Sequence, residues 1–345
     1  MSLARRVWRM PKAGSIGQLR LKDESIPAPG ADEVRISVKA IGLNFADIFA
    51  MYGLYSATPP GSFVPGLEYA GEVEAVGENV SSVQVGEKIM GVTRFGGYAD
   101  CLNIDHRYVV PLPATWNFEQ GAAFLVQVLT AYYSLFPLGH LQPGQTLLIH
   151  SAAGGVGLLA NRIAKQKQAF TIGTVGRVEK LDLLKAEGYD QGIVRSRDFA
   201  RDLKHALAGR ELNLVLECIG GRILKESFAA LAPMGRLVSY GSAQYAAPGN
   251  RPNYLKALWY YLNRPRLDTL SLIEQNKSFM AFNLIHLYEK AHIMHEMLKE
   301  IQMLQLAPPH IGHTFTFNNL KAAIRLFQSG KTVGKVVVTV PNETR

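Results

Sequence analysis

Cysteine is nearly absent, because the chain of 345 residues contains only Cys101 and Cys218. Two cysteines cannot build a scaffold of several disulfides, and they cannot supply a four-cysteine zinc site. Long apolar runs are also lacking, and we expect none to reach the roughly 18–20 residues that a membrane span needs. Residues 1–14 are basic but lead into no apolar stretch, which disfavours a secretory signal. These absences predict a reducing, cytoplasmic setting.

Acidic residues are in deficit: 28 Asp or Glu stand against 37 Lys or Arg, a net charge of +9. Such a protein can bind nucleic acid, a membrane surface or a small anionic ligand. The chain has no block of five Lys or Arg, no zinc-finger spacing and no aromatic-basic RNA motif, so we expect no nucleic-acid partner. Between Arg162 and Arg210 there are 11 basic and 6 acidic residues. That local excess fits a solvated basic face or a site for a polyanionic cofactor.

The first 120 or so residues predict short β-strands separated by turns. Residues 34–40 alternate apolar and polar side chains, as a half-buried strand does. Between Gly66 and Gly91, five glycines are interspersed with Val and Ile, which favours closely spaced turns in a small antiparallel barrel. The one helix that this part predicts covers residues 44–52. This half of the chain is therefore expected to be mostly β.

From about residue 118 onward, predicted strands and helices alternate. Residues 146–150 form a short, almost wholly apolar run, typical of a central parallel strand. Val156, Leu159, Ala160, Ile163 and Ala164 then follow the spacing of one helix face. Further strands are predicted at 170–175, 212–218, 236–241, 279–284 and 336–340, and helices at 120–136, 180–187, 224–231, 286–304 and 320–328. The alternation predicts an α/β class with a doubly wound parallel sheet of the Rossmann type.

A glycine-rich loop lies between the strand at 146–150 and the helix that follows it. Its sequence, Ala152-Ala153-Gly154-Gly155-Val156-Gly157, is a dinucleotide fingerprint with Ala at the first Gly position. The second Gly lets the backbone approach a pyrophosphate, and the helix N-terminus favours negative charge there. We therefore interpret Ala153, Gly154, Gly155 and Val156 as cofactor-binding residues, the alternative being a plain structural turn.

The end of the next predicted strand indicates which dinucleotide is preferred. NAD sites usually carry an acidic residue there, but no Asp or Glu occurs between Gln168 and Val178. Gly176 and Arg177 end the strand instead, Lys180 follows one turn later, and Arg195 lies near the next strand end. Basic side chains attract a 2′-phosphate, so NADPH is the expected cofactor. The alternative is that Arg177 and Lys180 only begin a solvated helix.

Several motifs together resemble the medium-chain dehydrogenase/reductase superfamily. They are Gly42-Leu43-Asn44-Phe45-Ala46-Asp47, Pro65-Gly66-Leu67-Glu68-Tyr69-Ala70-Gly71, Gly96-Gly97-Tyr98-Ala99, residues 152–157 and Gly334-Lys335-Val336-Val337. In finer detail, Gly53-Leu54-Tyr55, Leu141-Gln142-Pro143-Gly144, Pro233-Met234-Gly235 and Tyr240-Gly241 are similar to the zinc-free quinone oxidoreductase branch and most similar to its VAT-1 group. The resemblance implies a GroES-like catalytic domain (1–122 with 307–345) and a Rossmann NADP-binding domain (123–306).

The resemblance also implies a metal-free site. Where zinc-dependent members have a Cys and a Gly-His-Glu triplet, this chain has Asn44 and Gly66-Leu67-Glu68, and leucine cannot coordinate a metal. Without a Lewis acid, simple alcohol–aldehyde interconversion is disfavoured. Quinones and α,β-unsaturated carbonyls delocalise the arriving charge themselves and need only hydrogen-bond donors. Glu68 is expected to have a structural hydrogen-bonding role.

The family's functional positions fall on particular residues of this chain. Asn44 is expected near the nicotinamide, where its amide orients the acceptor, unless it only caps the next helix. Thr130, Gly241, Ser242, Ala281, Phe282, Asn283 and Lys335 are expected to contact the cofactor. Phe49 stands where characterised members have Tyr, which leaves Tyr52 as the catalytic candidate, with Tyr55 nearby. His150 is expected to be a buried histidine with satisfied hydrogen bonds.

Residues 246–275 are less regular and combine aromatic with basic side chains. They predict a lid, a pocket for an anionic substrate, a membrane-contacting patch or an ordinary packed insertion. Phe279 to Leu284 resembles the edge strand through which family members form homodimers. The resulting hypothesis is an NADPH-dependent, zinc-independent oxidoreductase that transfers hydride to a quinone or enone. The alternative is an NADPH-binding protein with little turnover and a scaffold or peripheral membrane role.

Overall fold

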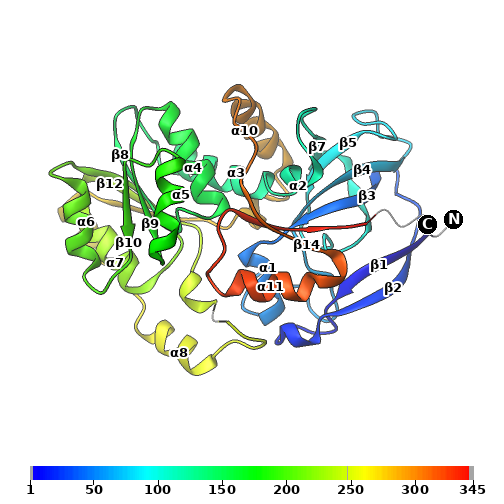
Figure 1. The fold of residues 1–345 in the computed structure, drawn as a ribbon, viewed down its shortest axis with the longest axis horizontal. Coiled ribbons are helices and arrows are strands. Elements are labelled where there is room, and N and C mark those ends of the chain that lie inside the picture. The colour runs from blue at the N-terminus through cyan, green and yellow to red at the C-terminus, as the bar shows by residue number, and fades with distance from the viewer. Residues whose placement is uncertain (1–2, 247, 342–345) are drawn as a thin grey trace.

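The computed structural model describes residues 3–246 and 248–341 and has two sheets side by side (Figure 1). One is a six-stranded parallel sheet in the order β10-β9-β8-β11-β12-β13. Its strands are β8 (Thr146–Ile149), β9 (Phe170–Val175), β10 (Gln191–Val194), β11 (Leu212–Glu217), β12 (Leu231–Ser239) and β13 (Ser278–Ala281). The helices between them are α4 (Gly155–Gln166), α5 (Leu181–Ala186), α6 (Phe199–Leu207) and α7 (Gly221–Ala230). The chain reverses its direction of winding between β8 and β11, where such folds bind ligands.

The other sheet has seven strands and joins the two ends of the chain. Its order is β14-β15-β3-β4-β5-β7, with β6 paired to β3. The strands are β3 (Glu33–Gly42), β4 (Glu68–Val76), β5 (Lys88–Val92), β6 (Cys101–Asp105), β7 (Val109–Pro111), β14 (Ile311–Thr316) and β15 (Lys335–Thr339). A hairpin of β1 (Leu3–Arg9) and β2 (Arg20–Ile26), helix α1 (Phe45–Tyr52) and helix α11 (Leu320–Gln328) flank it. Because β15 pairs with β3, residues from the last part of the chain reach the first part.

These two sheets confirm the expected α/β class with a Rossmann-like parallel sheet and a mostly-β partner; the domain boundaries themselves stay a prediction. The segment 246–275 is more regular than its sequence indicates. It forms α8 (Tyr254–Leu262) and α9 (Thr269–Gln275), and the side chains of Asn253 and Asp268 accept hydrogen bonds from the first-turn amides of Lys256 and Ser271. The strand expected at 279–284 ends at Ala281, and α10 (Ala291–Met303) begins later than expected.

One helical stretch corrects the expectation that no segment is apolar enough for a membrane span. By length and composition alone, Phe118–Leu138 meets that test. It is divided into α2 (Phe118–Gly121), α3 (Leu125–Tyr133) and a π-helical turn at Ser134–Leu138 that contains Pro137. In its most apolar window 67% of the residues are buried inside the protein, and α3 packs against α4 and α10. A core helix satisfies the same criterion because it too is surrounded by apolar groups.

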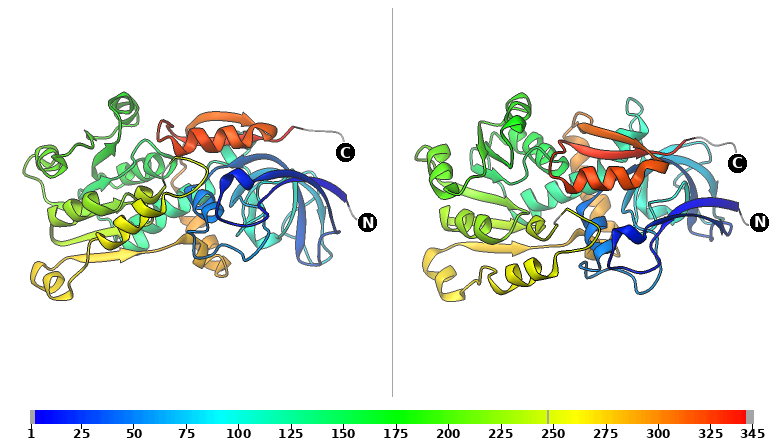
Figure 2. Two further views of the ribbon diagram at one scale, coloured as in Figure 1. Left: turned by 90° about the horizontal axis from the view of Figure 1, so that it is seen from below. Right: turned by 60° about the horizontal axis from the view of Figure 1, so that its bottom comes forward.

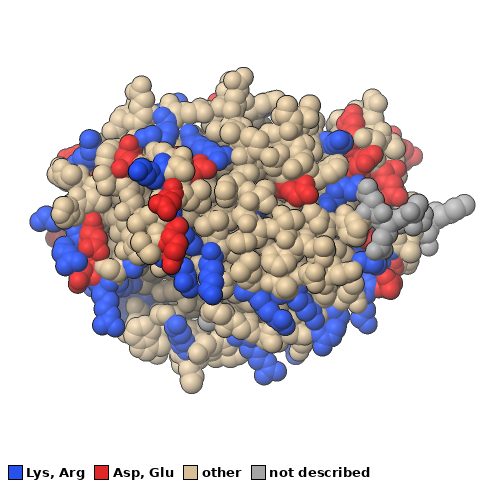
Figure 3. All heavy atoms as spheres, viewed as in Figure 1, with Lys and Arg blue, Asp and Glu red and all other residues tan. Residues whose placement is uncertain are grey.

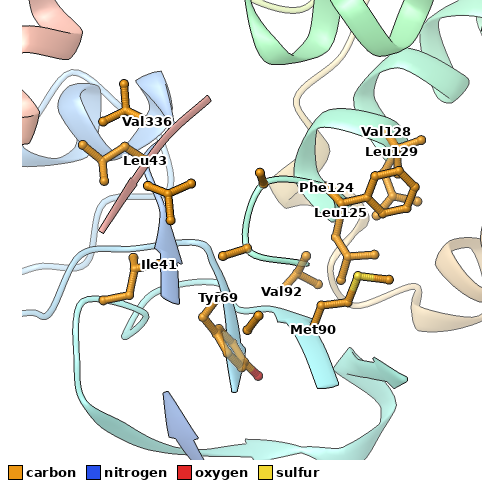
Figure 4. Close-up of a cluster of buried hydrophobic side chains, with 14 of the residues drawn as sticks. Ile41, Leu43, Tyr69, Met90, Val92, Phe124, Leu125, Val128, Leu129 and Val336 are labelled. Carbon is orange, nitrogen blue, oxygen red and sulfur yellow. The ribbon is translucent and has the colours of Figure 1, made fainter. Parts of the chain in front are cut away.

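The main core continues from the seven-stranded sheet to α3 (Figure 4). Ile41, Leu43 and Val336 meet where β3 ends and β15 begins, and Tyr69, Met90 and Val92 come from β4 and β5. Phe124, Leu125, Val128 and Leu129 of the α3 segment cover them. A smaller cluster, with Leu148, Phe199 and Val215, lies beneath α6 and α7. Burial of each such side chain contributes about 1.5–3 kcal/mol to the free energy of unfolding. This core therefore stabilises the packing of the seven-stranded sheet against α3.

Candidate active site

A cavity of about 1100 Å³ lies between the carboxyl ends of the parallel strands and the mostly-β half. Most of the site residues expected from the sequence line it: Asn44, Thr130, Ala153, Gly154, Gly155, Val156, Gly176, Lys180, Arg195, Gly241, Ser242, Ala281, Phe282, Asn283 and Lys335. Tyr52 and Arg177 are the two expected residues that do not line it. The cavity therefore brings together residues from positions 44 to 335 of the chain.

The glycine loop forms one end of the cavity. Gly154 is the N-cap of α4 with extended backbone angles, so the first amides of the helix have no partner within it. A Cβ atom on Gly157 would lie 2.6 Å from the carbonyl oxygen of Ala152, which explains why only glycine allows this close helix–strand contact. The loop is also tied to the other sheet, because the amide of Gly334 donates to the oxygen of Ala153 at 2.7 Å. This geometry suits a pyrophosphate at the helix N-terminus.

A basic corner, formed by Lys180 and Arg195, follows the glycine loop. Lys180 Nζ donates to the carbonyl oxygens of Gly330 and Thr332, at 2.8 and 2.6 Å. Burial lowers the pKa of Lys180, and the nearby arginines lower it further. Among the described residues, no Asp or Glu lines the cavity. Glu179 and Glu217 act on these cations but do not line the cavity, so the two cations face it without a carboxylate, which favours a phosphate group.

Arg195 belongs to a directed chain of buried hydrogen bonds. Its Nη1 donates to Thr174 Oγ1 at 3.1 Å, and Thr174 Oγ1 lies 2.8 Å from His150 Nδ1. His150 Nε2 lies 2.8 Å from Ser227 Oγ, which itself donates to the oxygen of Ile223. Because the hydroxyl of Ser227 is used as a donor, His150 must be protonated at Nε2 and accept from Thr174 at Nδ1. Burial and Arg195 lower the pKa of His150 to about 3, so the ring is neutral. The expectation of a buried, satisfied histidine is confirmed.

An ionic cluster lies beside the glycine loop, where a Cβ atom on Gly155 would be 3.1 Å from the side chain of Gln127. Glu68, at the start of β4, and Lys335, at the start of β15, are both buried, and Lys335 Nζ is 2.7 Å from Glu68 Oε2. The same Nζ donates to Asn44 Oδ1 at 2.8 Å. Gln127 Nε2 donates to both of these oxygens, and the amide of Val126 donates to Glu68 Oε1 at 2.9 Å. The structural hydrogen-bonding role expected for Glu68 is confirmed.

The sequence left open whether Asn44 caps a helix or lies at the site, and in the structure it does both: it begins α1 and lines the cavity. As the N-cap residue of α1, it donates a hydrogen bond from its backbone amide to Asp47 Oδ2 at 2.8 Å. Its side chain, however, is directed into the ionic cluster rather than toward the helix amides. Asp47 is fully buried and also accepts a hydrogen bond from Tyr98 OH, while its Oδ1 has no partner. Burial raises the pKa of Asp47 to about 7, although its hydrogen bonds and Lys335 act against this.

The tyrosines of α1 and of the loop after it differ in position. Tyr52 is buried, and its hydroxyl donates to the oxygen of Gly249 and accepts from Gln328. Tyr55 lies beyond Gly53, whose φ of 74° ends the helix, and it lines the cavity. Its hydroxyl donates to Asn283 Oδ1 at 2.8 Å, and burial raises its pKa to about 12. Tyr55 therefore takes the place at the cavity that the sequence suggested for Tyr52.

Other side chains at the site occupy positions that sequence reasoning missed. Gln127 is the only large polar residue in the apolar run of α3, a signal that was available in the sequence. Thr174 could not be recognised, because threonine is common in buried strands. Cys218 also lines the cavity, but burial raises its pKa to about 11 and keeps it a thiol. Thr130, which was expected there, donates to the oxygen of Val126 one turn back, so it is satisfied within its helix while it lines the cavity.

Comparison with known proteins identifies the family to which this fold belongs. Two family models match: "Alcohol dehydrogenase GroES-like domain" over residues 30–114 and "Zinc-binding dehydrogenase" over residues 155–299. The human synaptic vesicle membrane protein VAT-1 homolog is 31% identical over 325 residues, which are 93% of this chain and 82% of that protein. The zebrafish (Danio rerio) VAT-1 homolog is 32% identical over 317 residues, which are 91% of this chain but 65% of that protein.

The chain belongs to the VAT-1 group of the medium-chain dehydrogenases/reductases. Solved structures agree with this assignment. The CurK enoyl reductase superposes with a TM-score of 0.83 at 29% identity, covering 98% of this chain and 99% of that one. The quinone oxidoreductase of Thermus thermophilus, solved also as a complex with NADPH, gives 0.80 at 29% identity, covering 97% and 99%. This VAT-1 group member is thus a protein of an oxidoreductase family, and one of its structural neighbours binds NADPH.

The description of one matching family model implies zinc, and the donors present do not suit it. Among residues 3–246 and 248–341, no group of three His, Cys, Asp or Glu side chains could hold a metal ion. Asn44 and Glu68 do converge, but the ammonium of Lys335 already lies within 2.8 Å of an oxygen of each. A divalent cation bound to the same oxygens would lie against this positive charge, which Coulomb repulsion strongly disfavours.

Proposed function

We propose that this protein is an NADPH-dependent oxidoreductase that transfers hydride to an α,β-unsaturated carbonyl or a quinone without a metal ion. The observation that carries the proposal is the cavity that joins the glycine loop and the basic corner to the donors Tyr55 and Lys335. Such donors suffice for acceptors that delocalise the incoming charge. The enoyl reductase and quinone oxidoreductase neighbours support the same reaction class.

The roles of the residues follow from their positions. The amides of the glycine loop bind the pyrophosphate, and the basic corner binds the 2′-phosphate. When bound, NADPH supplies the hydride. The residues 281–283 and Gly241 confine the nicotinamide half of the cavity. Tyr55 stays protonated at neutral pH, because its pKa is about 12, and its hydroxyl turns from Asn283 Oδ1 to the acceptor oxygen when substrate binds. The protein thus contributes mainly position and charge complementarity.

The cofactor preference is tested with Arg195→Ala. Removing one charge-assisted contact to the 2′-phosphate, worth about 1.5–3 kcal/mol, should weaken NADPH binding roughly 10–100-fold in calorimetry. NADH binding should be unchanged. Arg197→Ala is the matched control, since Arg197 is exposed and does not line the cavity. Equal losses for NADPH and NADH in Arg195→Ala would contradict a phosphate contact.

Turnover is tested with the purified chain, NADPH and a panel of quinones and enones, followed by the absorbance of the reduced nicotinamide. We expect oxidation with at least one acceptor class. Tight NADPH binding without oxidation of any acceptor would instead favour the second candidate function, a dinucleotide-binding protein at a membrane surface.

The second candidate rests on α8 and α9, which expose an unusually apolar surface. Leu255 is 83% and Ile273 75% exposed. The other large apolar side chains exposed there are Tyr254, Leu258, Trp259, Tyr261, Leu262, Leu267 and Leu270. Figure 2 shows α8 at an edge of the molecule, and its residues Tyr254, Leu258 and Tyr261 also line the cavity. A solvated apolar surface of this kind marks an interaction site.

The charge around this surface selects an anionic lipid as its partner. Between Arg251 and Lys277 the chain has five basic and two acidic residues. Among the charged side chains in the lower part of the face in Figure 3, where α8 lies in Figure 1, Lys and Arg predominate. An amphipathic segment with basic flanks binds anionic bilayers through both its apolar area and its charge. We therefore propose that α8 and α9 contact a membrane surface.

Vesicle co-sedimentation tests this contact. Phosphatidylserine-containing vesicles should retain the protein, and neutral phosphatidylcholine vesicles should retain it far less. A Leu255→Ser/Trp259→Ser variant should lose most of the binding, whereas Leu21→Ser, which changes an exposed leucine of β2, should not. Equal retention on both vesicle types, or by both variants, would reject the membrane proposal.

We also propose a homodimer through β13, the last strand in the order of the parallel sheet. Its free edge can pair with the same edge of a second copy and extend the sheet. Light scattering should then give about twice the chain mass, and a proline at Met280 should shift it to the monomer. An unchanged mass would reject pairing through this edge.

A further inference from the structure

The part of the cavity beyond β13 lies far from the basic corner. Lys180 and Arg195 follow β9 and β10 at one edge of the parallel sheet, whereas β13 is at the other edge, roughly 20 Å from β9 at the usual strand spacing. Asn283 follows β13 and is the N-cap residue of the 3-10 turn η6 (Leu284–Leu287). It also accepts the hydrogen bond from Tyr55, so the side chain proposed to bind the acceptor lies where η6 begins.

Four elements that pack together form the wall of this part of the cavity. Helix α3 contacts α10, η6 and β5, and each of the four elements supplies side chains to the wall. These side chains, here named the apolar end, are Val92 of β5, Leu129 of α3, Ile285 and Leu287 of η6, and Met294 and Met297 of α10. Both methionines are buried and yet line the cavity, so a ligand in the apolar end would contact them directly.

The apolar end offers no charge to a ligand. Among the described residues, the charged side chains that line the cavity are those of the basic corner and Lys335, which belongs to the ionic cluster beside the glycine loop. The polar groups next to the apolar end are used within the protein. Thr93 Oγ1 donates to the oxygen of Phe95 at 2.6 Å, and the hydroxyl of Tyr108 donates to the oxygen of Tyr288 at 2.6 Å. A ligand group there gains free energy from burial of apolar surface rather than from hydrogen bonds.

Rigid and adaptable side chains are combined at this end. Tyr108 and Tyr288 both line the cavity, and their rings stack with centroids 3.9 Å apart. Met294 and Met297 have flexible, unbranched side chains that can adjust to a ligand. The cavity as a whole, at about 1100 Å³, is at the upper limit of small-molecule sites, which commonly measure about 300–1000 Å³. These features suit a flexible chain more than a compact polar group.

We propose that the acceptor is an enone or quinone that carries a flexible apolar chain, with its carbonyl group at Tyr55 and its chain in the apolar end, along η6 and α10. This inference rests on the proposed function, because it names the class of acceptor for that hydride transfer. A short acceptor leaves the apolar end to water, whereas each methylene buried there strengthens binding about fourfold.

A series of straight-chain enones measures this preference. All share one head group, and their saturated tails range from about two to eight carbons, so that each step adds a known apolar area. With NADPH, kcat/KM should rise about 2–4-fold per methylene and should level off once the tail is longer than the apolar end. The assay contains no vesicles, so contact of α8 with a bilayer plays no part.

The variant Met297→Gln tests where the tail lies. It keeps the length of the side chain but makes the wall polar, and it should reduce the gain to less than about half of the wild-type value per methylene. Met303→Gln is the matched control on the same helix, because Met303 is 67% exposed and does not line the cavity. Urea unfolding shows whether the buried substitution leaves the protein folded.

A second variant, Ile285→Trp, does not bury a polar group. It fills part of the apolar end, so the gain in kcat/KM should level off at a shorter tail than in wild type. His286→Trp introduces the same ring at the next residue, which is exposed and does not line the cavity, and should leave the limiting tail length unchanged.

Binding of saturated methyl ketones with NADP⁺ does not depend on turnover, because the oxidised cofactor has no hydride to transfer. In calorimetry their affinity should rise with tail length in wild type and in Met303→Gln, and much less in Met297→Gln. This measurement separates the two proposals. If ketone affinity depends on tail length but no enone is reduced, the proposed function fails and the apolar chain stands. If enones are reduced equally well whatever their tail, the proposed function stands and the apolar chain fails.

Two results would overturn the proposal. The first is a gain of less than about twofold per methylene in wild type, because the tail would then remain in water. The second is an unchanged gain in folded Met297→Gln, or an unchanged limiting tail length in Ile285→Trp. The tail would then lie elsewhere, for instance on the exposed apolar side chains of α8.

Discussion

Two clusters of buried polar side chains, one in each half of the molecule, differ in charge. The ionic cluster of the mostly-β half contains Glu68 and Lys335 with Asn44 and Gln127 between them. The neutral chain of the parallel-sheet half runs from Thr174 through His150 to Ser227. In the neutral chain, every described side chain has hydrogen-bond partners. In the ionic cluster, one of the three N–H donors of Lys335 has no partner among the described residues. The nearby Asp47 also has an unpartnered oxygen.

The difference distinguishes a cluster that can contact a ligand from a chain that only holds another side chain in place. A closed chain of neutral hydrogen bonds orders its members and has nothing left to offer a ligand. Burial of a charge costs much more than burial of a neutral hydroxyl, and a protein bears that cost where the charge acts. We therefore expect the ionic cluster to contact a bound ligand directly and the neutral chain to act only through Arg195.

The largest predicted effect is the acid sensitivity of the neutral chain. His150 has a pKa of about 3 in the folded protein against 6.5 in the unfolded chain, so the unfolded chain binds the extra proton first. The stability that His150 contributes is fully present above pH 6.5 and is lost as pH falls toward 3. The loss approaches about 5 kcal/mol, or about 1.4 kcal/mol per pH unit. Urea unfolding between pH 7 and pH 4 measures it.

The variant His150→Leu should remove this part of the slope, although unpaired hydroxyls lower its stability at pH 7 by about 1–3 kcal/mol. His205→Leu, at an exposed position of α6, is the control and should keep the slope. An unchanged slope in His150→Leu would show that another group causes the acid sensitivity.

The second-largest expected effect is the loss of stability when the ionic cluster is broken. Glu68→Leu leaves the ammonium of Lys335 buried without its carboxylate, and the free energy of unfolding should fall by about 3–5 kcal/mol. Glu24→Leu serves as a comparison, because its ion pairs with Arg5 and Arg9 are partly exposed and should cost only about 1 kcal/mol. Equal losses in the two variants would remove the distinction between a buried and a solvated pair.

Asp47 should give the opposite pH dependence to His150. Burial raises its pKa from 3.8 to about 7, so the folded protein holds a proton that the unfolded chain has released. Its contribution is present below pH 3.8 and is lost as pH rises through 7, at most about 4 kcal/mol. Asp47→Asn should flatten the stability curve between pH 4 and pH 7. A curve as steep as that of wild type would assign the effect elsewhere.

The smallest expected effect tests whether the neutral chain holds Arg195 in position. Thr174→Val removes the hydroxyl between Arg195 and His150 and should cost about 1 kcal/mol of stability. NADPH should bind a few-fold more weakly, with NADH unaffected. Thr171→Val, at the other end of β9, also loses a hydroxyl but does not contact Arg195. Calorimetry on both variants distinguishes the two; equal affinities would mean that Arg195 is not held by Thr174.

Local sequence patterns were enough to predict the class of fold, the position of the glycine loop and the residues of the basic corner. Apolar runs, helical spacing and glycines are local signals, and they place a strand, a turn and a helix in order along the chain. Arg195 and Lys180 were also predictable, because they follow strand ends whose position the local pattern fixes. The two helices in residues 246–275 bury none of their residues, so no buried apolar face marks them in the sequence.

Which distant side chains meet at the cavity depends on the pairing of strands from opposite ends of the chain. Glu68 and Lys335 are separated by 267 positions and come together because β15 returns to pair with β3. Likewise, the choice between Tyr52 and Tyr55 depends on where α1 ends, since Gly53 turns the chain so that only the second ring faces the cavity. No local pattern encodes such contacts, because they depend on how distant strands pair and where a helix stops.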